Sequence, residues 1–150
     1  YQNKAVQVNN KYMRLQETPP LNSNSATHFI SGHLSLTDAE FDEHYRRAID
    51  DALTRGDSFV VGDALGADAL AQNYLHGKTD SVTVYHMFTE PRNNAGFKTI
   101  GGFETDSERD AQMTAASDAD IAWVRPGRNK SGTQRNIDRR TQDSKSNDSD

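Results

Sequence analysis

The chain lacks cysteine entirely, and it also lacks long apolar runs. The first absence excludes disulfide bonds, thiolate metal ligands and a cysteine nucleophile, and it favours an intracellular, cytoplasmic location. No apolar run approaches the roughly 20 residues of a membrane-spanning helix, so we expect no membrane partner. We also expect no metal and no cofactor, because the histidines show no metal-ligand spacing; they are His28, His33, His44, His76 and His86.

Basic residues are scarce in the central part of the chain. Residues 27–127 hold 8 Lys and Arg against 17 Asp and Glu, a net charge of −9. A duplex groove requires a basic stripe, so we expect no duplex DNA partner. The stretch Arg128–Arg140 is a basic exception, and it is interpreted either as a solvated helix face or as a contact for an acidic protein or RNA.

The two ends of the chain differ in composition from the middle. Residues 1–26 are rich in Asn and Gln and include Pro19 and Pro20, which predicts a polar N-terminal extension. Residues 141–150 contain no apolar residue, which predicts a disordered C-terminal tail. The remaining residues, 27–140, are long enough for one domain with a core of its own.

Within 27–140, strand-like and helix-like patterns alternate. Apolar and β-branched runs predict four strands, at 27–32, 58–62, 81–88 and 120–127. Helical spacing predicts helices at 36–56, over Ala67–Leu75, at 105–117 and from 131 onward, with a long loop at 89–104. Two Thr-x-x-Glu capping boxes, at Thr37 and Thr105, support two of these helix starts. The alternation predicts one α/β domain of the Rossmann-like, three-layer kind, with a mostly parallel sheet of four to five strands.

Small and polar residues follow three of the predicted strands. Ligands of parallel sheets bind beyond the carboxyl ends of the strands, and helix starts offer free N–H groups that suit a phosphate. We therefore expect a small nucleotide-like ligand at this edge, with its phosphate close to the backbone of Gly66. The candidate ligand-binding residues are Ser31, Gly32, His33, Gly62, Asp63, Gly66, Ala67, Asp68, Arg109, Ser131, Gly132 and Thr133.

Several candidates have a structural alternative. Asp63 either accepts from ribose hydroxyls or caps a helix, and Ser131 to Thr133 either hold a phosphate or cap the last helix. Arg109 either counters a phosphate, anchors a loop or forms a surface ion pair with a nearby carboxylate. His33 either reaches the pocket with a pKa near neutrality or has no catalytic part. The catalytic candidates, should the protein be an enzyme, are Asp63, Asp68, His33 and Arg109.

The segment "GDALGADALA" (62–71) resembles the Gly-Gly-Ala-x-Gly-Ala-Asp-x-x-Ala motif of the YspA-like branch of the SLOG superfamily. This superfamily comprises Rossmann-like domains related to the LOG phosphoribohydrolases and to DNA-processing protein A. Three further segments are similar to its motifs in the same order, and the resemblance covers 27–140. These segments are "ISGH" (30–33), "SERDAQM" (107–113) and "RPGRNKSGTQRNI" (125–137).

The resemblance implies binding of a nucleotide or nucleotide-derived ligand, as in a sensor or regulatory module. A hydrolase that cleaves the N-glycosidic or phosphoribosyl bond of a nucleotide is the second hypothesis, and a structural or assembly protein is the third. In LOG enzymes a glutamate lies three residues after the threonine of Gly-Thr, whereas this chain has Asn136 there. Asp63, Asp68, Glu104 and Asp106 are alternative carboxylates, and a homodimer is among the partners considered.

Overall fold

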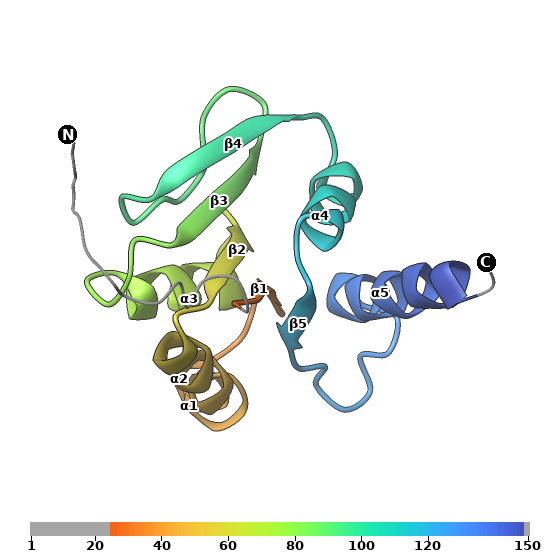
Figure 1. The fold of residues 1–150 in the computed structure, drawn as a ribbon, viewed down its shortest axis with the longest axis horizontal. Helices are drawn as coiled ribbons and strands as arrows, with labels where there is room; N and C mark the ends of the chain where they lie inside the picture. The colour runs from red at the N-terminus through yellow and green to blue at the C-terminus, as the bar shows by residue number, and fades with distance from the viewer. Residues whose placement is uncertain (1–24, 149–150) are drawn as a thin grey trace.

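The computed structural model describes residues 25–148 (Figure 1), so most of the predicted N-terminal extension lies outside the described residues. Within this part, five parallel strands form one sheet in the order β4-β3-β2-β1-β5. The strands are β1 (Thr27–Ser31), β2 (Ser58–Gly62), β3 (Val82–Met87), β4 (Lys98–Phe103) and β5 (Ala119–Ala122). The helices are α1 (Asp38–His44), α2 (Arg46–Arg55), α3 (Ala67–Leu75), α4 (Asp106–Ala115) and α5 (Gly132–Asp148).

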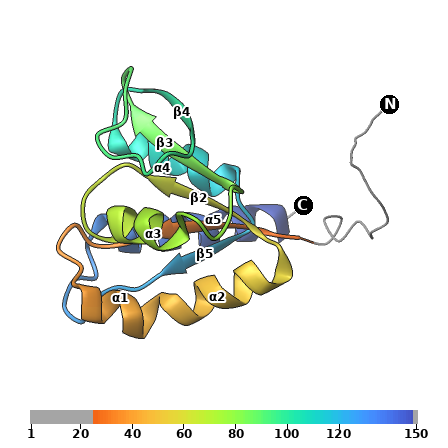
Figure 2. The same ribbon diagram turned by 90° about the vertical axis from the view of Figure 1, so that its left-hand side faces the viewer.

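Helices cover both faces of this sheet, with α1, α2 and α3 on one side and α4 and α5 on the other (Figures 1 and 2). Successive strand side chains point to opposite faces, so adjacent residues enter different cores. Ile30 and Val61 belong to the larger core beneath α1, α2 and α3. Their neighbours Phe29 and Val60 pack with Met113 of α4. The predicted Rossmann-like, three-layer α/β domain is therefore confirmed.

Side-chain caps begin two of the helices. Thr37 Oγ1 accepts from the N–H of Glu40, and Glu40 Oε1 accepts from the N–H of Thr37, so the first predicted capping box is complete. Thr105 Oγ1 likewise accepts from the N–H of Glu108. Glu108, however, turns its carboxylate to the N–H of Glu104, one residue before the cap.

The single helix predicted over 36–56 is two helices that meet at Tyr45, where φ is −120°. The Tyr45 side chain is fully buried, and its hydroxyl donates to the carbonyl of Ser31 at 2.8 Å. The same hydroxyl accepts from the N–H of Trp123 at 3.1 Å. Tyr45 thus ties the break in the helix to the carboxyl ends of β1 and β5, a contact that helical spacing does not reveal.

The loop predicted at 89–104 contains the edge strand β4. Its residues are largely exposed, so no buried face marks it as a strand in the sequence. Gly101 lies against His86, because a Cβ there would stand 2.1 Å from the imidazole Cε1. Gly102 has a φ of +95°, and the register with β3 shifts beside it.

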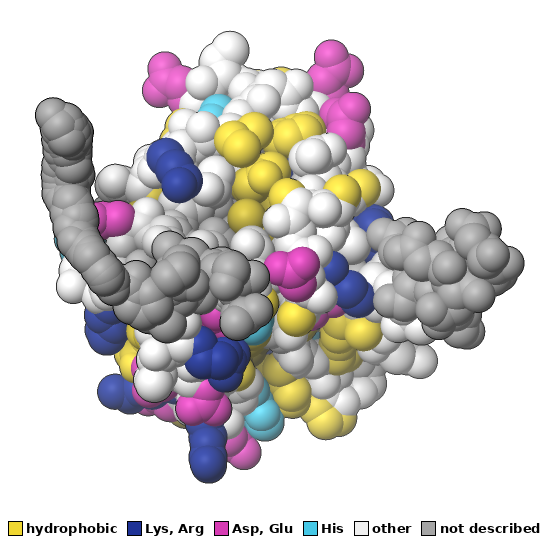
Figure 3. Space-filling model, in the orientation of Figure 1, with side chains coloured by type: hydrophobic (Ala, Val, Ile, Leu, Met, Phe, Trp, Pro, Cys, Tyr) yellow, Lys and Arg dark blue, Asp and Glu magenta, His cyan; other side chains and the backbone are white. Residues whose placement is uncertain are grey.

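Hydrophobic side chains gather on the surface over the part of the sheet that β3 and β4 form (Figure 3). Phe88 is 61% exposed and Ile100 is 45% exposed. The register shift and the positive φ of Gly102 interrupt the free edge of β4 at its carboxyl end. Irregular edges of this kind discourage pairing with a strand from another molecule.

Helix α5 continues to Asp148, whereas the sequence predicted a disordered tail from residue 141. Residues 141–148 are helical, and residues 149–150 lie outside the described part. No Gly or Pro follows Gly132 in the sequence, so nothing in the backbone chemistry stops the helix once it has begun. Among the described helices, none combines the length and the apolar character needed to cross a membrane.

Candidate functional site

A cavity of about 340 Å³ opens at the carboxyl edge of the sheet. From β1 the chain proceeds to β2 on one side, while β5 lies on the other side of β1, so the direction of winding reverses here. Such a switch point is where open α/β sheets bind ligands. The cavity wall comes from the segment after β1, the starts of α3 and α5, the loop before β4, and α4.

Eight of the twelve predicted residues line this cavity: Ser31, Gly32, His33, Asp68, Arg109, Ser131, Gly132 and Thr133. The other four, Gly62, Asp63, Gly66 and Ala67, do not. The wall also contains residues absent from the prediction: Phe29, Leu34, Ala64, Arg92, Asp106, Ser107, Asp110, Met113, Arg128, Arg135, Asn136 and Arg139. The sequence indicates Asp106 as an alternative carboxylate and residues 128–140 as a basic stretch. It offers no reason to place Arg92 at the site, because Arg92 lies in the loop predicted at 89–104.

Gly66 faces the protein's own backbone rather than the cavity. Its φ is +72°, and a Cβ on it would lie 2.4 Å from the carbonyl oxygens of His33 and Leu34. The glycine therefore permits the close approach of two loops. This corrects the expectation that a phosphate approaches the backbone at Gly66.

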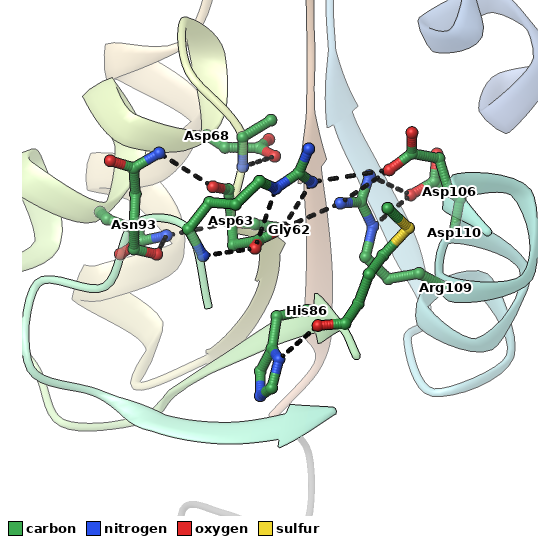
Figure 4. A network of polar contacts seen from close by, with 12 residues as sticks. Gly62, Asp63, Asp68, His86, Asn93, Asp106, Arg109 and Asp110 are labelled. Atoms are coloured by element: carbon green, nitrogen blue, oxygen red, sulfur yellow. Dashed lines mark hydrogen bonds and ion pairs between the residues drawn. The ribbon is translucent and has the colours of Figure 1, made fainter. Parts of the chain in front are cut away.

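Asp63 lies behind the cavity wall and holds two of the arginines in it (Figure 4). Its carboxylate accepts from Arg92 at Nη2 (2.8 Å), Nε (3.1 Å) and the backbone N (2.8 Å), and from Arg109 Nη1 at 3.0 Å. Burial alone would raise the pKa of Asp63, but the Arg92 hydrogen bonds and both charges lower it. Asp63 is therefore neither a helix cap nor a ribose contact; it positions Arg92 and Arg109.

Arg109 is buried and surrounded by carboxylates. Its guanidinium contacts Asp63 at 3.0 Å, Asp106 at 3.2 Å and Asp110 at 3.0 Å. Burial would lower the pKa of Arg109, but the charges of Asp110 and its acidic neighbours raise it, so the guanidinium stays protonated. An anion at Arg109 has to compete with these three partners.

Asp68 presents a carboxyl group in the cavity wall while remaining only 8% exposed. Its Oδ2 accepts from the N–H of Ala64 at 3.1 Å. A Cβ on Gly62 would lie 2.5 Å from that oxygen, so Gly62 is needed for this close packing. Burial raises the pKa of Asp68 to about 7, although the charge of Arg109 acts in the opposite direction.

His33 is a buried, neutral imidazole. Its Nε2 accepts from the N–H of Arg125 at 2.8 Å, which places the ring proton on Nδ1. Burial, followed by the charges of Arg125 and Arg128, lowers the pKa of His33 below its ordinary value. This differs from the expectation that His33 titrates near neutrality.

The start of α5 closes the cavity opposite α4. Ser131 Oγ accepts from the N–H of Gln134 at 3.2 Å, so its hydroxyl caps the helix as one alternative proposed. Asn136 is buried, and its Oδ1 accepts from Arg139 Nη1 at 2.7 Å. This amide cannot exchange protons as a carboxylate does.

The basic stretch is divided between the cavity and a partly buried ion pair outside it. Arg128, Arg135 and Arg139 line the cavity. Within the described residues, the guanidinium of Arg128 forms no hydrogen bond or ion pair, whereas Arg135 donates to the carbonyl of Lys130. Arg140 instead binds the Asp120 carboxylate at 2.9 Å, outside the cavity.

Ser31 lines the cavity, and its side chain carries an unsatisfied polar group. Its Oγ is buried and has no hydrogen-bond partner in the structure, although its carbonyl accepts from Tyr45. A buried hydroxyl without a partner costs about 1–3 kcal/mol. Such groups in folded proteins usually meet a ligand or a water molecule.

The described residues include no group of three or more His, Asp or Glu side chains arranged to hold a metal ion. Comparisons of the chain with protein-family models, curated proteins and solved structures give no match. The resemblance to the SLOG superfamily therefore stays a prediction.

Proposed function

We propose that the protein binds a nucleotide or nucleotide-derived ligand in this cavity, as a sensor or regulatory module. The observation that carries the proposal is that Ser31, whose buried Oγ is unsatisfied, lines the cavity together with the start of α5, at the switch point of the sheet. The N-terminus of this 17-residue helix favours an anion. Arg128 adds a cation that pairs with no carboxylate in the part of the chain that the structure describes.

The charges of the wall orient such a ligand. Arg128, Arg135 and Arg139 stand at the α5 end, and none of them pairs with a carboxylate among the described residues, so they suit a phosphate. At the α4 end the carboxylates of Asp106 and Asp110 surround Arg109, and they suit ligand hydroxyl or amino groups. A volume of about 340 Å³ lies at the small end of ligand pockets and suits one nucleoside monophosphate.

Calorimetric titration with AMP, GMP, ADP-ribose and NAD tests the proposal. Arg128→Gln is expected to weaken binding about tenfold, or about 1.4 kcal/mol, because it removes the free cation. Lys130→Gln is the matched control, since it removes the same charge from the same loop but lies outside the cavity wall. The proposal fails if the wild type binds none of the four ligands, or if Arg128→Gln binds as tightly as Lys130→Gln.

Hydrolysis of the N-glycosidic bond is the second candidate function, and Asp68 is the observation that favours it. A buried carboxyl that is partly protonated near neutrality is suited to general acid catalysis. Asn136 weighs against it, because the amide replaces the carboxylate of the hydrolases. Chromatography of AMP incubated with the protein distinguishes the two: release of adenine supports the hydrolase, and binding without release supports the module.

A further inference from the structure

Few groups around Asp68 stabilise the negative charge of its carboxylate. The carboxyl is 8% exposed, and its hydrogen bond comes from the backbone N–H of Ala64. Gly62 packs against the same carboxyl, because a Cβ added to this glycine would lie 2.5 Å from Oδ2, so the protein itself covers that side of Asp68. Hydration, the usual means of stabilising a carboxylate, is therefore largely absent.

The cation facing Asp68 is already shared. Arg109 contacts three other carboxylates, those of Asp63, Asp106 and Asp110, at 3.0–3.2 Å (Figure 4). The titratable and charged groups that face Asp68 are Arg109 and Asp110 of α4, Asp63 after β2, Arg92 before β4, Tyr45 between α1 and α2, and the neutral His33 after β1. A further negative charge in the same small cavity increases the cost of ionising Asp68.

We propose that Asp68 couples anion binding to proton uptake, so that the ligand binds best when the Asp68 carboxyl is protonated. The step is a protonation equilibrium only: a proton from solvent joins the carboxylate as the anion enters, and it returns to solvent when the anion leaves. The occupancy of the cavity then depends on both the pH and the charge of the ligand. This inference rests on the proposed function, since it requires an anion in the cavity.

The size of the effect follows from the position of the pKa. With a pKa of about 7, Asp68 is about one-quarter protonated at pH 7.5 in the empty protein. An anion that raises this pKa by about one unit brings the protonated fraction to about three-quarters. Binding then takes up about half a proton at pH 7.5, and affinity falls roughly tenfold as pH rises from 6 to 9.

Calorimetry of AMP binding at pH 7.5 in PIPES and in Tris measures this uptake, because the two buffers release protons with different enthalpies. The wild type is expected to take up about half a proton more than Asp68→Asn, whose amide cannot titrate. Protons exchanged by the AMP phosphate appear equally in both proteins. Asp42→Asn is the matched control: it removes a carboxylate that is 59% exposed and lies outside the cavity wall, and it is expected to retain the uptake.

Equal proton uptake by the wild type and Asp68→Asn overturns this inference and leaves the proposed function intact. Absence of AMP, GMP, ADP-ribose and NAD binding overturns both. Circular dichroism checks that the variant folds. If Asp68→Asn does not fold, the wild type alone tests the inference. Its proton uptake at pH 7.5 must largely disappear at pH 9.0. An uptake that is unchanged at pH 9.0 contradicts the role of Asp68.

Discussion

Arg109 Nη1, on α4, donates to Asp63 Oδ1, at the carboxyl end of β2, over 3.0 Å (Figure 4). Both side chains are buried, and the same carboxylate holds Arg92 in the loop before β4. One carboxylate therefore fixes three segments that are far apart in the sequence. It also aims two guanidinium groups at the wall of the cavity.

Asp63→Asn is expected to destabilise the fold by about 3 kcal/mol, because two arginines lose their shared charge partner in a buried setting. Urea denaturation followed by circular dichroism measures this change. The matched control is Asp42→Asn, which removes an exposed partner of Arg46 at 3.4 Å and is expected to cost less than about 0.5 kcal/mol. Equal midpoints for the two variants would contradict a positioning role for Asp63.

Gly66→Ala is expected to cost about 3 kcal/mol or to prevent folding. The added Cβ would lie 2.4 Å from two backbone oxygens, and φ is +72°. Gly77→Ala provides the comparison, since φ there is +83° but nothing lies within 4 Å of the Cβ position. That variant is expected to lose only about 1 kcal/mol, from the backbone conformation alone. Similar losses in chemical denaturation would show that the loop contact at Gly66 is unimportant.

Asp68→Asn is expected to stabilise the protein at alkaline pH and to have little effect at acid pH. The folded-state pKa of about 7 lies above the unfolded value of 3.8, so the folded state binds more protons between these values. The wild type therefore loses stability as pH rises from about 4 to 7, by an amount on the order of 4 kcal/mol. The amide variant avoids this loss. Denaturation at pH 4.5 and pH 8 gives the two differences, and a pH-independent difference would refute the prediction.

Arg140→Gln is expected to lower stability by about 2 kcal/mol, since it removes a partly buried ion pair and hydrogen bonds to two carbonyls. Arg140 binds Asp120 and donates to the carbonyls of Thr114 and Ser117, which joins α5 to the end of α4. Arg135→Gln, on the same helix, is expected to change the melting temperature by less than about 2 °C. An unchanged melting temperature for Arg140→Gln would instead return this arginine to the solvated face that the sequence suggested.

The sequence by itself determined the elements whose signals are local. The cap at Thr37, the apolar run at 58–62 and the β-α alternation depend on residues a few positions apart, and they predicted the parallel sheet with helices on both faces. The alternation also implied that the segments after β1, β2 and β5 meet at one edge. The segments after β1 and β5 line one cavity, whereas Ala64 is the one residue of 62–66 that lines it. Periodicity and capping suffice for such predictions because each is complete within one element.

The tertiary structure decided the features that depend on contacts across the chain. Arg92 is held in the cavity wall by Asp63, which lies 29 positions earlier in the chain. The helix breaks at Tyr45, whose hydroxyl contacts the backbone of Trp123, 78 positions later. The interpretation of Gly66 changed for the same reason. The sequence suggests that another group comes close to the backbone of this glycine, but only the fold shows that the group is the backbone of His33 and Leu34. Burial and charge pairing are set by these distant neighbours, so the ionisation of Asp68 and His33 follows from the folded chain and not from local spacing.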